Sequence, residues 1–279
     1  MSIKVRFIAL ITAVLFVPCL AMAEETYNLF PFAGGVEFVS YSNDSVYVQA
    51  TVEYPQSAVY NYQPRTMSTP EMVLDTLTSE RDKVYVVNDK LYVHSPESAG
   101  IKGIDNGDMY TIPQDSWSPF LVSIYEEDAL VFLMAKGEEI HVCRLDTLTG
   151  EFQSVNMGVS LFSIQPYGKN RSLLVNTDGA TGEKIISELN WETLELREKG
   201  KLPDGATSIA YSKQEDCIYF MVDGSLWTYQ WNGSKQQKAS GFPLWTDQRA
   251  FILDSGVFTT LYFDLEEAML TIDLNNLTK

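Results

Sequence analysis

The feature that most constrains this chain is a repeat of about 42 residues that recurs six times. Its first landmark is a polar turn followed by an apolar strand, as in VNDKLYV, EEDALVF and QEDCIYF. The six apolar strands start at Val46, Leu91, Leu130, Leu173, Ile218 and Val257, in steps of 45, 39, 43, 45 and 39 residues. The second landmark, an apolar residue followed by Asn or Asp, places Asn61, Asp105, Asp146, Asn190, Asn232 and Asp273 in steps of 44, 41, 44, 42 and 41. Because the two landmarks keep the same step, we interpret the chain as a repeat protein.

The residue types within each repeat are those of short strands and tight turns. Apolar and polar residues alternate with a period of two, and no long stretch has a helical period. Tyr, Val, Phe, Ile and Thr, which dominate the apolar runs, are residues that strands prefer. Asn and Asp end these runs because they bond to their own downstream backbone and tolerate left-handed geometry. Each repeat therefore holds about four short strands.

A repeat of this length with four strands is typical of one blade of a β-propeller. A single blade cannot bury both of its faces, whereas neighbouring blades stacked in a ring can. The sequence predicts an all-β protein, a β-propeller of six four-stranded blades over residues 24–279. An open pair of β-sandwiches is the alternative architecture.

The alternation also places the innermost and outermost strands of each blade. The innermost strands are expected to begin near Val36, Lys83, Phe120, Leu161, Thr207 and Ala250. The outermost strands are expected near Met72–Leu77, Asp108–Ile112, Phe152–Asn156, Leu196–Lys199 and Lys235–Ala239. The sixth repeat ends after its third strand, and Thr26–Phe30 is free to supply the fourth. Pairing the N- and C-terminal segments would close the ring and remove its open edges.

The first 23 residues have the pattern of a secretory signal peptide. Lys4 and Arg6 form a short basic head, an apolar run follows from Phe7 to Leu20, and Ala21-Met22-Ala23 supplies the small residues of a cleavage site. The alternatives are an uncleaved anchor and a lipidated Cys19, although Pro18 fits a lipoprotein signal poorly. No second apolar run is long enough to span a bilayer, so we expect no integral membrane segment in the mature chain. The protein is expected to be secreted, at a bacterial cell surface or in the periplasm.

The charge of the chain narrows the partners it can have. Removal of the signal peptide leaves 18 basic and 37 acidic residues, a net charge of −19. Such a surface repels phosphate backbones and anionic membranes, which argues against nucleic-acid binding. Among the cysteines, Cys143 and Cys217 lie far apart in apolar strand-like runs, so no disulfide framework is expected. A single bridge between these two remains an alternative.

Catalytic motifs are missing from the sequence. It contains no nucleophile elbow, phosphate-binding loop, paired-histidine zinc motif or CxxC. His141 and Cys143 share a strand face, and a packed core pair is favoured over a metal site because no third ligand is evident. The loop Asp178–Glu183 is interpreted as a hairpin and not as a calcium site. Acidic clusters occur at Glu126–Asp128, Glu138–Glu139 and Asp264–Glu267, and two carboxylates could serve a glycosidase if they lay on opposite sides of a sugar bond. The first two clusters are interpreted as solvated hairpin turns. The sequence therefore predicts no catalytic residue, no metal and no cofactor.

Aromatic residues are the best candidates for binding. Trp227, Tyr229 and Trp231 alternate along one strand face, which favours packing against the next blade. Trp117 and Trp245 lie instead in connections that lead into an innermost strand, where the loops of a propeller gather around the channel mouth. These two tryptophans are the predicted ligand-binding residues, and we expect their rings to stack on a sugar or an apolar ligand. The alternative is that they are plugs that seal the ring.

Repeat units such as IAYSKQEDCIYFMVDGSLWTYQWNG resemble blades of bacterial propellers. The resemblance is to the N-terminal propeller of some bacterial extracellular solute-binding proteins of ABC transporters, and it spans about residues 24–279. It implies a part in nutrient uptake. We therefore expect a non-catalytic extracellular propeller that binds a small molecule, a carbohydrate or a surface protein. The alternatives are an extracellular polysaccharide hydrolase or lyase, and a purely structural interaction module.

Overall fold

The computed structural model describes most of the chain after the predicted signal peptide. The described residues are 27–31, 36–42, 45–53, 56–63, 69–77, 82–95, 100–112, 117–126, 128–158, 161–240, 250–254, 259–264 and 268–273. Every regular element among them is a β-strand, and no described helix has the length and apolar character needed to cross a membrane. The predicted signal peptide, including Cys19, lies outside the described residues.

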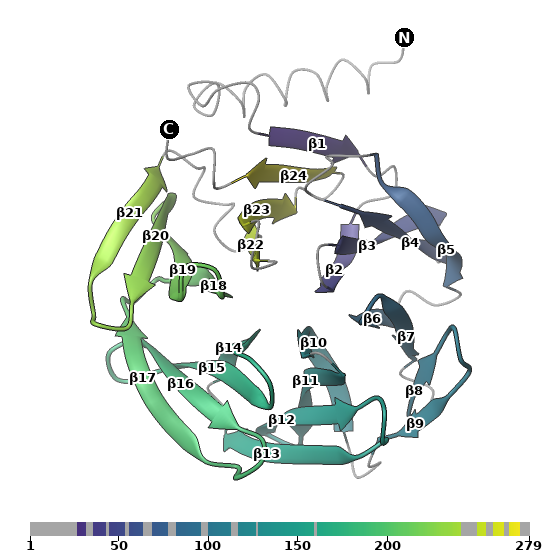
Figure 1. Cartoon of the computed structure of the whole chain (residues 1–279), viewed down its shortest axis with the longest axis horizontal. Coiled ribbons are helices and arrows are strands. Elements are labelled where there is room, and N and C mark those ends of the chain that lie inside the picture. The colour runs from purple at the N-terminus through teal and green to yellow at the C-terminus, as the bar shows by residue number, and fades with distance from the viewer. Residues whose placement is uncertain are drawn as a thin grey trace. The chain divides into compact units, whose positions relative to one another are not determined.

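Five blades are each made of four consecutive antiparallel strands (Figure 1). The strands of these blades are β2 (Val36–Ser42), β3 (Ser45–Glu53), β4 (Gln56–Tyr62) and β5 (Glu71–Leu77); β6 (Lys83–Val87), β7 (Lys90–His94), β8 (Gly100–Gly103) and β9 (Met109–Thr111); β10 (Trp117–Glu126), β11 (Ala129–Lys136), β12 (Glu139–Asp146) and β13 (Phe152–Gly158); β14 (Leu161–Pro166), β15 (Arg171–Thr177), β16 (Lys184–Asn190) and β17 (Leu196–Leu202); and β18 (Thr207–Ser212), β19 (Cys217–Val222), β20 (Ser225–Gln230) and β21 (Lys235–Ser240). Within each blade, strands that follow one another in sequence are hydrogen-bonded neighbours.

A further four-stranded sheet combines both ends of the described chain. Its order is β1 (Tyr27–Pro31), β24 (Ala268–Asp273), β23 (Thr259–Asp264) and β22 (Ala250–Asp254). The fold is an all-β β-propeller, as predicted, and the open β-sandwich alternative is wrong. The blade count differs from the prediction, because five blades are continuous in sequence and the predicted sixth exists only as this composite sheet.

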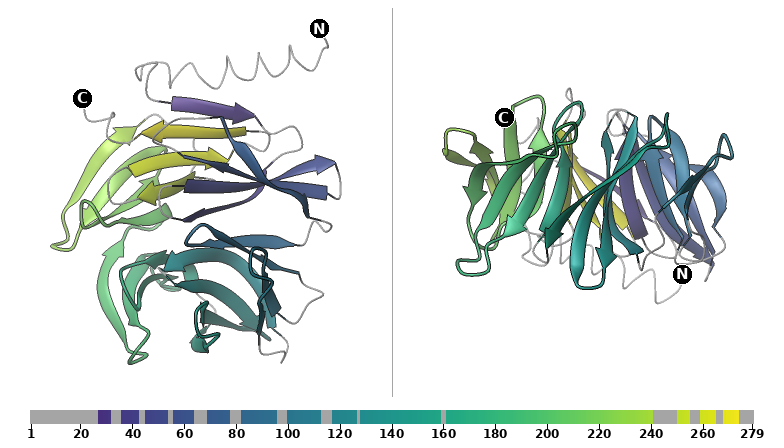
Figure 2. Two further views of the ribbon diagram at one scale, coloured as in Figure 1. Left: turned by 45° about the vertical axis from the view of Figure 1, so that its right-hand side comes forward. Right: turned by 90° about the horizontal axis from the view of Figure 1, so that it is seen from below.

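The chain divides into two compact units. Four blades, β2–β5, β6–β9, β10–β13 and β14–β17, lie within Phe30–Asp204 of one unit, and β18–β23 lie within Gly205–Asp264 of the other. In the first unit, β10 contacts β2, β6 and β14, so the first strand of each of these blades is the inner one. Figure 2 shows the twist of the blades from inner to outer strand. Five of the six predicted inner strands begin at the predicted residue, whereas β10 begins at Trp117 and not at Phe120.

The core of the first unit lies between the faces of adjacent blades. Tyr47, Val84, Val86 and Leu91 belong to one buried cluster that joins β2–β5 to β6–β9. Alternate residues of the same strands turn the other way, so that Tyr85 and Tyr92 pack with Phe132 of the next blade. A third cluster, which includes Val131, Leu174 and Trp191, joins β10–β13 to β14–β17. Blades β6–β9 and β10–β13 thus bury both of their faces through their neighbours, which is the physical reason for the repeat.

Three turns share one loop structure, and their sequences explain it. The loops are Asp146–Glu151 (DTLTGE), Asp178–Glu183 (DGATGE) and Asn190–Glu195 (NWETLE). In each loop, the side chain of the first residue accepts hydrogen bonds from the backbone N–H groups of the third and fourth residues. The hydroxyl of the fourth residue accepts a hydrogen bond from the backbone N–H of the sixth. The fifth residue has a positive φ, 74° at Gly150, 73° at Gly182 and 56° at Leu194. Asp178–Glu183 is therefore a hairpin loop, as interpreted from the sequence.

Cys143 on β12 and Cys217 on β19 are both buried, and neither forms a disulfide. The alternative of a single disulfide between them is wrong. Burial raises the pKa of the Cys143 thiol well above its usual range, so this side chain stays protonated and apolar in character. Stability must come from the apolar joints between blades and not from a covalent bridge.

Candidate functional site

Of the two tryptophans predicted to bind a ligand, only Trp117 falls within the described residues. It is the first residue of β10, where its backbone pairs with that of Lys136 on β11. The prediction that Trp117 lies in a connecting loop is wrong, because the inner strand starts three residues earlier than expected. Trp245 lies outside the described residues.

The strands of the first unit have two ends with different structures. At what we call the turn end, short turns join the first strand of a blade to the second and the third to the fourth. At the other end, the loop end, the chain passes from one blade to the next and each inner strand begins. Trp117, Asp82 and Ser95 belong to the loop end, together with the β11–β12 turn around Gly137.

A buried polar cluster lies at and below the loop end, between blades β2–β5 and β6–β9. Gln49 on β3 is only 1% exposed. Its amide nitrogen donates to the Asp82 carbonyl oxygen at 2.9 Å, and its amide oxygen accepts the Val84 N–H at 3.4 Å. The Ser95 hydroxyl donates to Asp82 Oδ1. Gln49 therefore satisfies two backbone groups of the next blade's inner strand, as burial of such groups requires.

His94, like Asp82, is a buried titratable side chain at the loop end. Desolvation lowers the pKa of His94 below its ordinary 6.5, and the nearby Asp82 charge opposes that shift only in part. By strand alternation, Asp82 is on the same face of its blade as Val84, and that face packs against blade β2–β5. His94 is on the same face as Tyr92, and that face packs against blade β10–β13. The strand alternation thus directs the acid and the imidazole to opposite faces of one blade, an arrangement unsuited to a shared proton-transfer step.

His141 and Cys143 lie on one face of β12, as predicted. Cys143 is fully buried in the cluster that joins β6–β9 to β10–β13, and His141 Nε2 lies 3.5 Å from Glu139 Oε2. Across the described ranges, no group of three or more His, Cys, Asp or Glu side chains is placed to hold a metal ion. Cys143 thus packs in the joint between two blades, and His141 lies beside Glu139 of its own strand.

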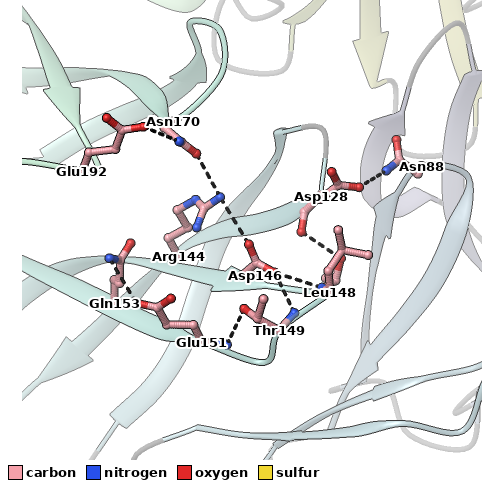
Figure 3. Close-up of polar contacts among 11 residues, drawn as sticks. Asn88, Asp128, Arg144, Asp146, Leu148, Thr149, Glu151, Gln153, Asn170 and Glu192 are labelled. Atoms are coloured by element: carbon pink, nitrogen blue, oxygen red, sulfur yellow. Dashed lines mark hydrogen bonds and ion pairs between the residues drawn. The ribbon is translucent and has the colours of Figure 1, made fainter.

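At the turn end, polar side chains join successive blades (Figure 3). Asn88 donates to Asp128 Oδ1 of the next blade at 2.9 Å. Arg144 donates to Asn170 Oδ1 of the following blade at 3.3 Å, and Asn170 in turn donates to Glu192 at 2.8 Å. Within a blade, the Asp128 carbonyl accepts both the N–H and the hydroxyl of Thr147 at 2.8 Å. The first landmark of the repeat therefore marks residues that join neighbouring blades.

The carboxylates that begin two hairpin loops, Asp146 at the turn end and Asp178 at the loop end, are engaged in local structure. Burial raises the pKa of Asp146, but bonds from Thr149 and Leu148 and the Arg144 charge outweigh it, so the net pKa lies below its usual value. Asp178 also has a lowered pKa, first because it accepts the Ala180 and Thr181 N–H groups. A general acid at neutral pH needs a raised pKa, so these groups act as turn anions and not as proton donors.

In the second unit, blade β18–β21 carries the predicted aromatic row. Tyr229 is buried, and Trp231 packs edge-on against it at 6.2 Å between ring centroids. Trp231 Nε1 and the Tyr211 hydroxyl both donate to Asp216 Oδ1, at 2.9 and 3.0 Å. Trp231 is thus anchored by the turn aspartate of its own blade, and packing of the row against the next blade stays a prediction.

Sequence reasoning missed Gln49 and Asp82. A signal for Gln49 was present, since it is the one amide in the otherwise apolar run SVYVQATV. Its partners lie 33 and 35 residues away, in the next repeat. A polar residue within a strand of a repeat protein is therefore a candidate for a bond between blades.

Comparisons with solved structures agree on the fold. No known protein family and no curated protein matches the sequence. A virginiamycin B lyase from Staphylococcus aureus with quinupristin has a TM-score of 0.57 at 12% identity, covering 88% of this chain and 99% of that one. An oligogalacturonate lyase in complex with manganese has a TM-score of 0.53 at 12% identity, covering 92% and 96%. TolB from Acinetobacter baumannii has a TM-score of 0.51 at 10% identity, covering 82% and 63%. At such identities these likenesses show the fold alone, a β-propeller scaffold.

Proposed function

We propose that this protein is a non-catalytic, secreted β-propeller that binds a small molecule, a carbohydrate or a surface protein at its loop end. The observation that carries the proposal is how the described polar groups are used. Gln49 and Asn88 make hydrogen bonds between blades, and strand alternation assigns Asp82 and His94 to opposite faces of one blade. Loops carried by a scaffold whose blades are joined in this way are where we propose that binding takes place.

Trp117 and Trp245 remain the proposed binding residues. The start of β10 supports Trp117, because its backbone pairs with that of Lys136 on β11 at the loop end. The resemblance to ABC-transporter propellers makes solute uptake the process in which we propose that it acts. A metal or cofactor is not part of the proposal.

We also propose that the composite sheet is the sixth blade and closes the ring. The support is that β1 and β24 are hydrogen-bonded neighbours although they come from opposite ends of the chain. Closure would cover the edge that β24 otherwise exposes. Deletion of Tyr27–Pro31 should therefore lower the melting temperature and broaden the transition, and an unchanged melting curve would rule out closure by β1.

The binding proposal is tested with defined glycans, oligogalacturonate among them. Calorimetry should detect binding, while ultraviolet absorbance should show no formation of unsaturated products. Trp117→Ala and Trp245→Ala should weaken binding at least tenfold and leave the melting temperature unchanged. Product formation would contradict the non-catalytic proposal. If both variants instead lose cooperative unfolding, the two rings are structural plugs and the binding proposal is wrong.

A further inference from the structure

The outermost strand of each blade has one row of backbone N–H and C=O groups facing away from its own blade. In four of the five continuous blades, the outer strand has a feature that discourages a further strand. β9 is only three residues long, and β5, β17 and β21 carry charged side chains. β13 (FQSVNMG) is seven residues long and carries no charged side chain. It is the least protected of these five edges.

The part of β13 that can take a partner is Phe152–Asn156. His141 pairs with Asn156 and Ile140 with Gly158, so Met157 is skipped and forms a bulge. The same kind of bulge occurs at Lys199 in β17 and at Lys238 in β21, where lysine occupies the skipped position and binds a glutamate of its own blade. Only in β13 is the straight part both long and uncharged.

The register shows which backbone groups of β13 point outward. The Asp146 N–H donates to the Glu151 carbonyl at 2.9 Å, which marks these residues as a hydrogen-bonded pair. Since such pairs alternate along an antiparallel ladder, Gln153 and Val155 bond to β12. Phe152, Ser154 and Asn156 then direct their N–H and C=O groups away from β12. The side chains of Ser154 and Asn156 are exposed.

We propose that β13 is an interaction edge on which β13 of a second copy of this chain pairs in antiparallel orientation. The outward residues are symmetric about Ser154. A two-fold axis there places Ser154 opposite Ser154 and Phe152 opposite Asn156, so every outward N–H meets an outward carbonyl. The result is an eight-stranded sheet built from two β10–β13 blades.

Charge explains both why this edge is used and why the pairing is weak. No charged side chain of one β13 opposes another, which is not so for β17 or β21. Each copy nevertheless carries a formal net charge of −17. Salt screens this repulsion over about 8–10 Å. Because five-residue pairing buries far less than the ~1,200 Å² of a stable interface, the dimer should depend on concentration and tighten with salt.

The test is sedimentation velocity of the full chain at increasing concentration, in low and in high salt. We expect the weight-average mass to rise toward that of a dimer, more steeply in high salt. Ser154→Lys should weaken association at least tenfold, because it sets two cations opposite each other. Ser154→Pro removes the central outward N–H without touching a bond to β12 and should have the same effect. Gln237→Lys, at an exposed site on the already charged β21, is the matched control and should associate like the wild type.

Melting curves of all three variants verify that they are folded. A wild-type chain that stays monomeric at every concentration in high salt overturns the proposal. So does a folded Ser154→Lys variant that associates as tightly as the wild type, since association would then use another surface.

Discussion

Two neighbouring joints between blades show different ways of fixing one repeat against the next. In the joint between β2–β5 and β6–β9, an apolar cluster around Val84 and Leu91 surrounds a buried amide, Gln49, which bonds to two backbone groups. In the joint between β6–β9 and β10–β13, Tyr85, Phe132 and their neighbours form a larger apolar cluster. There the bond from Asn88 to Asp128 is exposed.

The contrast between the two joints separates what stabilises a pair of blades from what fixes their position relative to each other. Apolar burial is non-directional, so a cluster such as that around Phe132 tolerates small slides of one blade along the next. The Gln49 amide is directional, because only one placement brings its oxygen to the Val84 N–H and its nitrogen to the Asp82 carbonyl. We infer that the first joint is aligned by a hydrogen-bonded amide and the second by the fit of large side chains.

The largest expected effect is at the apolar joint. Phe132 is 1% exposed and packs against Tyr85 and Phe152, each at 6.4 Å between ring centroids. Phe132→Ala removes this burial and leaves a cavity, so the free energy of unfolding should fall by about 3–5 kcal/mol. Equilibrium unfolding in urea measures it. Leu148→Ala, at a 72% exposed side chain, is the control and should change little. A loss below about 1 kcal/mol at Phe132 would mean that this joint is not the main source of stability.

The second effect is at the amide joint. Gln49→Met keeps the volume of the side chain but leaves the Asp82 carbonyl and the Val84 N–H without this partner. Two such losses should lower the free energy of unfolding by about 2–3 kcal/mol. Gln236→Met, at an exposed residue, is the matched control. If Gln49→Met were as stable as the wild type, the amide would not align the joint.

These joints also show how far the sequence alone can lead. The alternation and turn residues of each repeat act locally, so the inner strands at Val36, Lys83, Leu161, Thr207 and Ala250 were predicted to the residue. β10 was placed three residues late, because Pro119 interrupts the apolar pattern that its strand otherwise shows. The composite sheet was predicted from the missing strand of the last repeat, since Thr26–Phe30 overlaps β1.

Contacts between repeats were beyond this reasoning. Gln49 contacts its partners only because the two adjacent blades pack in one particular alignment. The spacing of residues within a repeat does not reveal that alignment. The second landmark of the repeat, an apolar residue followed by Asn or Asp, also misplaces the start of the loop between the third and fourth strands of blade β6–β9. There the loop bonds start at Gly103, whose N–H donates to the Asp108 carbonyl at 2.8 Å, and Asp105 does not take the place that Asp146 takes in the next blade. A glycine can begin this loop when Asn106 supplies the acceptor for the Asp108 N–H.

The third prediction compares two loops of the same structure. Gly150 and Leu194 occupy the fifth position of their loops, both at positive φ. L-residues other than Asn and Asp disfavour this region by about 1 kcal/mol. Leu194→Gly should therefore raise the free energy of unfolding, offset in part by the greater freedom of glycine in the unfolded chain. Gly150→Ala should lower it by about 1 kcal/mol. Urea unfolding of both variants decides, and equal signs would contradict the strain assigned to Leu194.

The smallest expected effect is at the exposed bond of the apolar joint. Asp128→Ala removes the acceptor of the Asn88 amide but keeps the carbonyl that binds Thr147. The exposed Asn88 amide can bond to water instead, so the free energy of unfolding should change by no more than about 0.5 kcal/mol. Urea unfolding beside Gln49→Met makes the comparison direct, because each variant removes a polar bridge between adjacent blades. If the two variants lost the same free energy of unfolding, burial would not explain the contribution of the Gln49 amide. Both joints would then be aligned by their polar contacts.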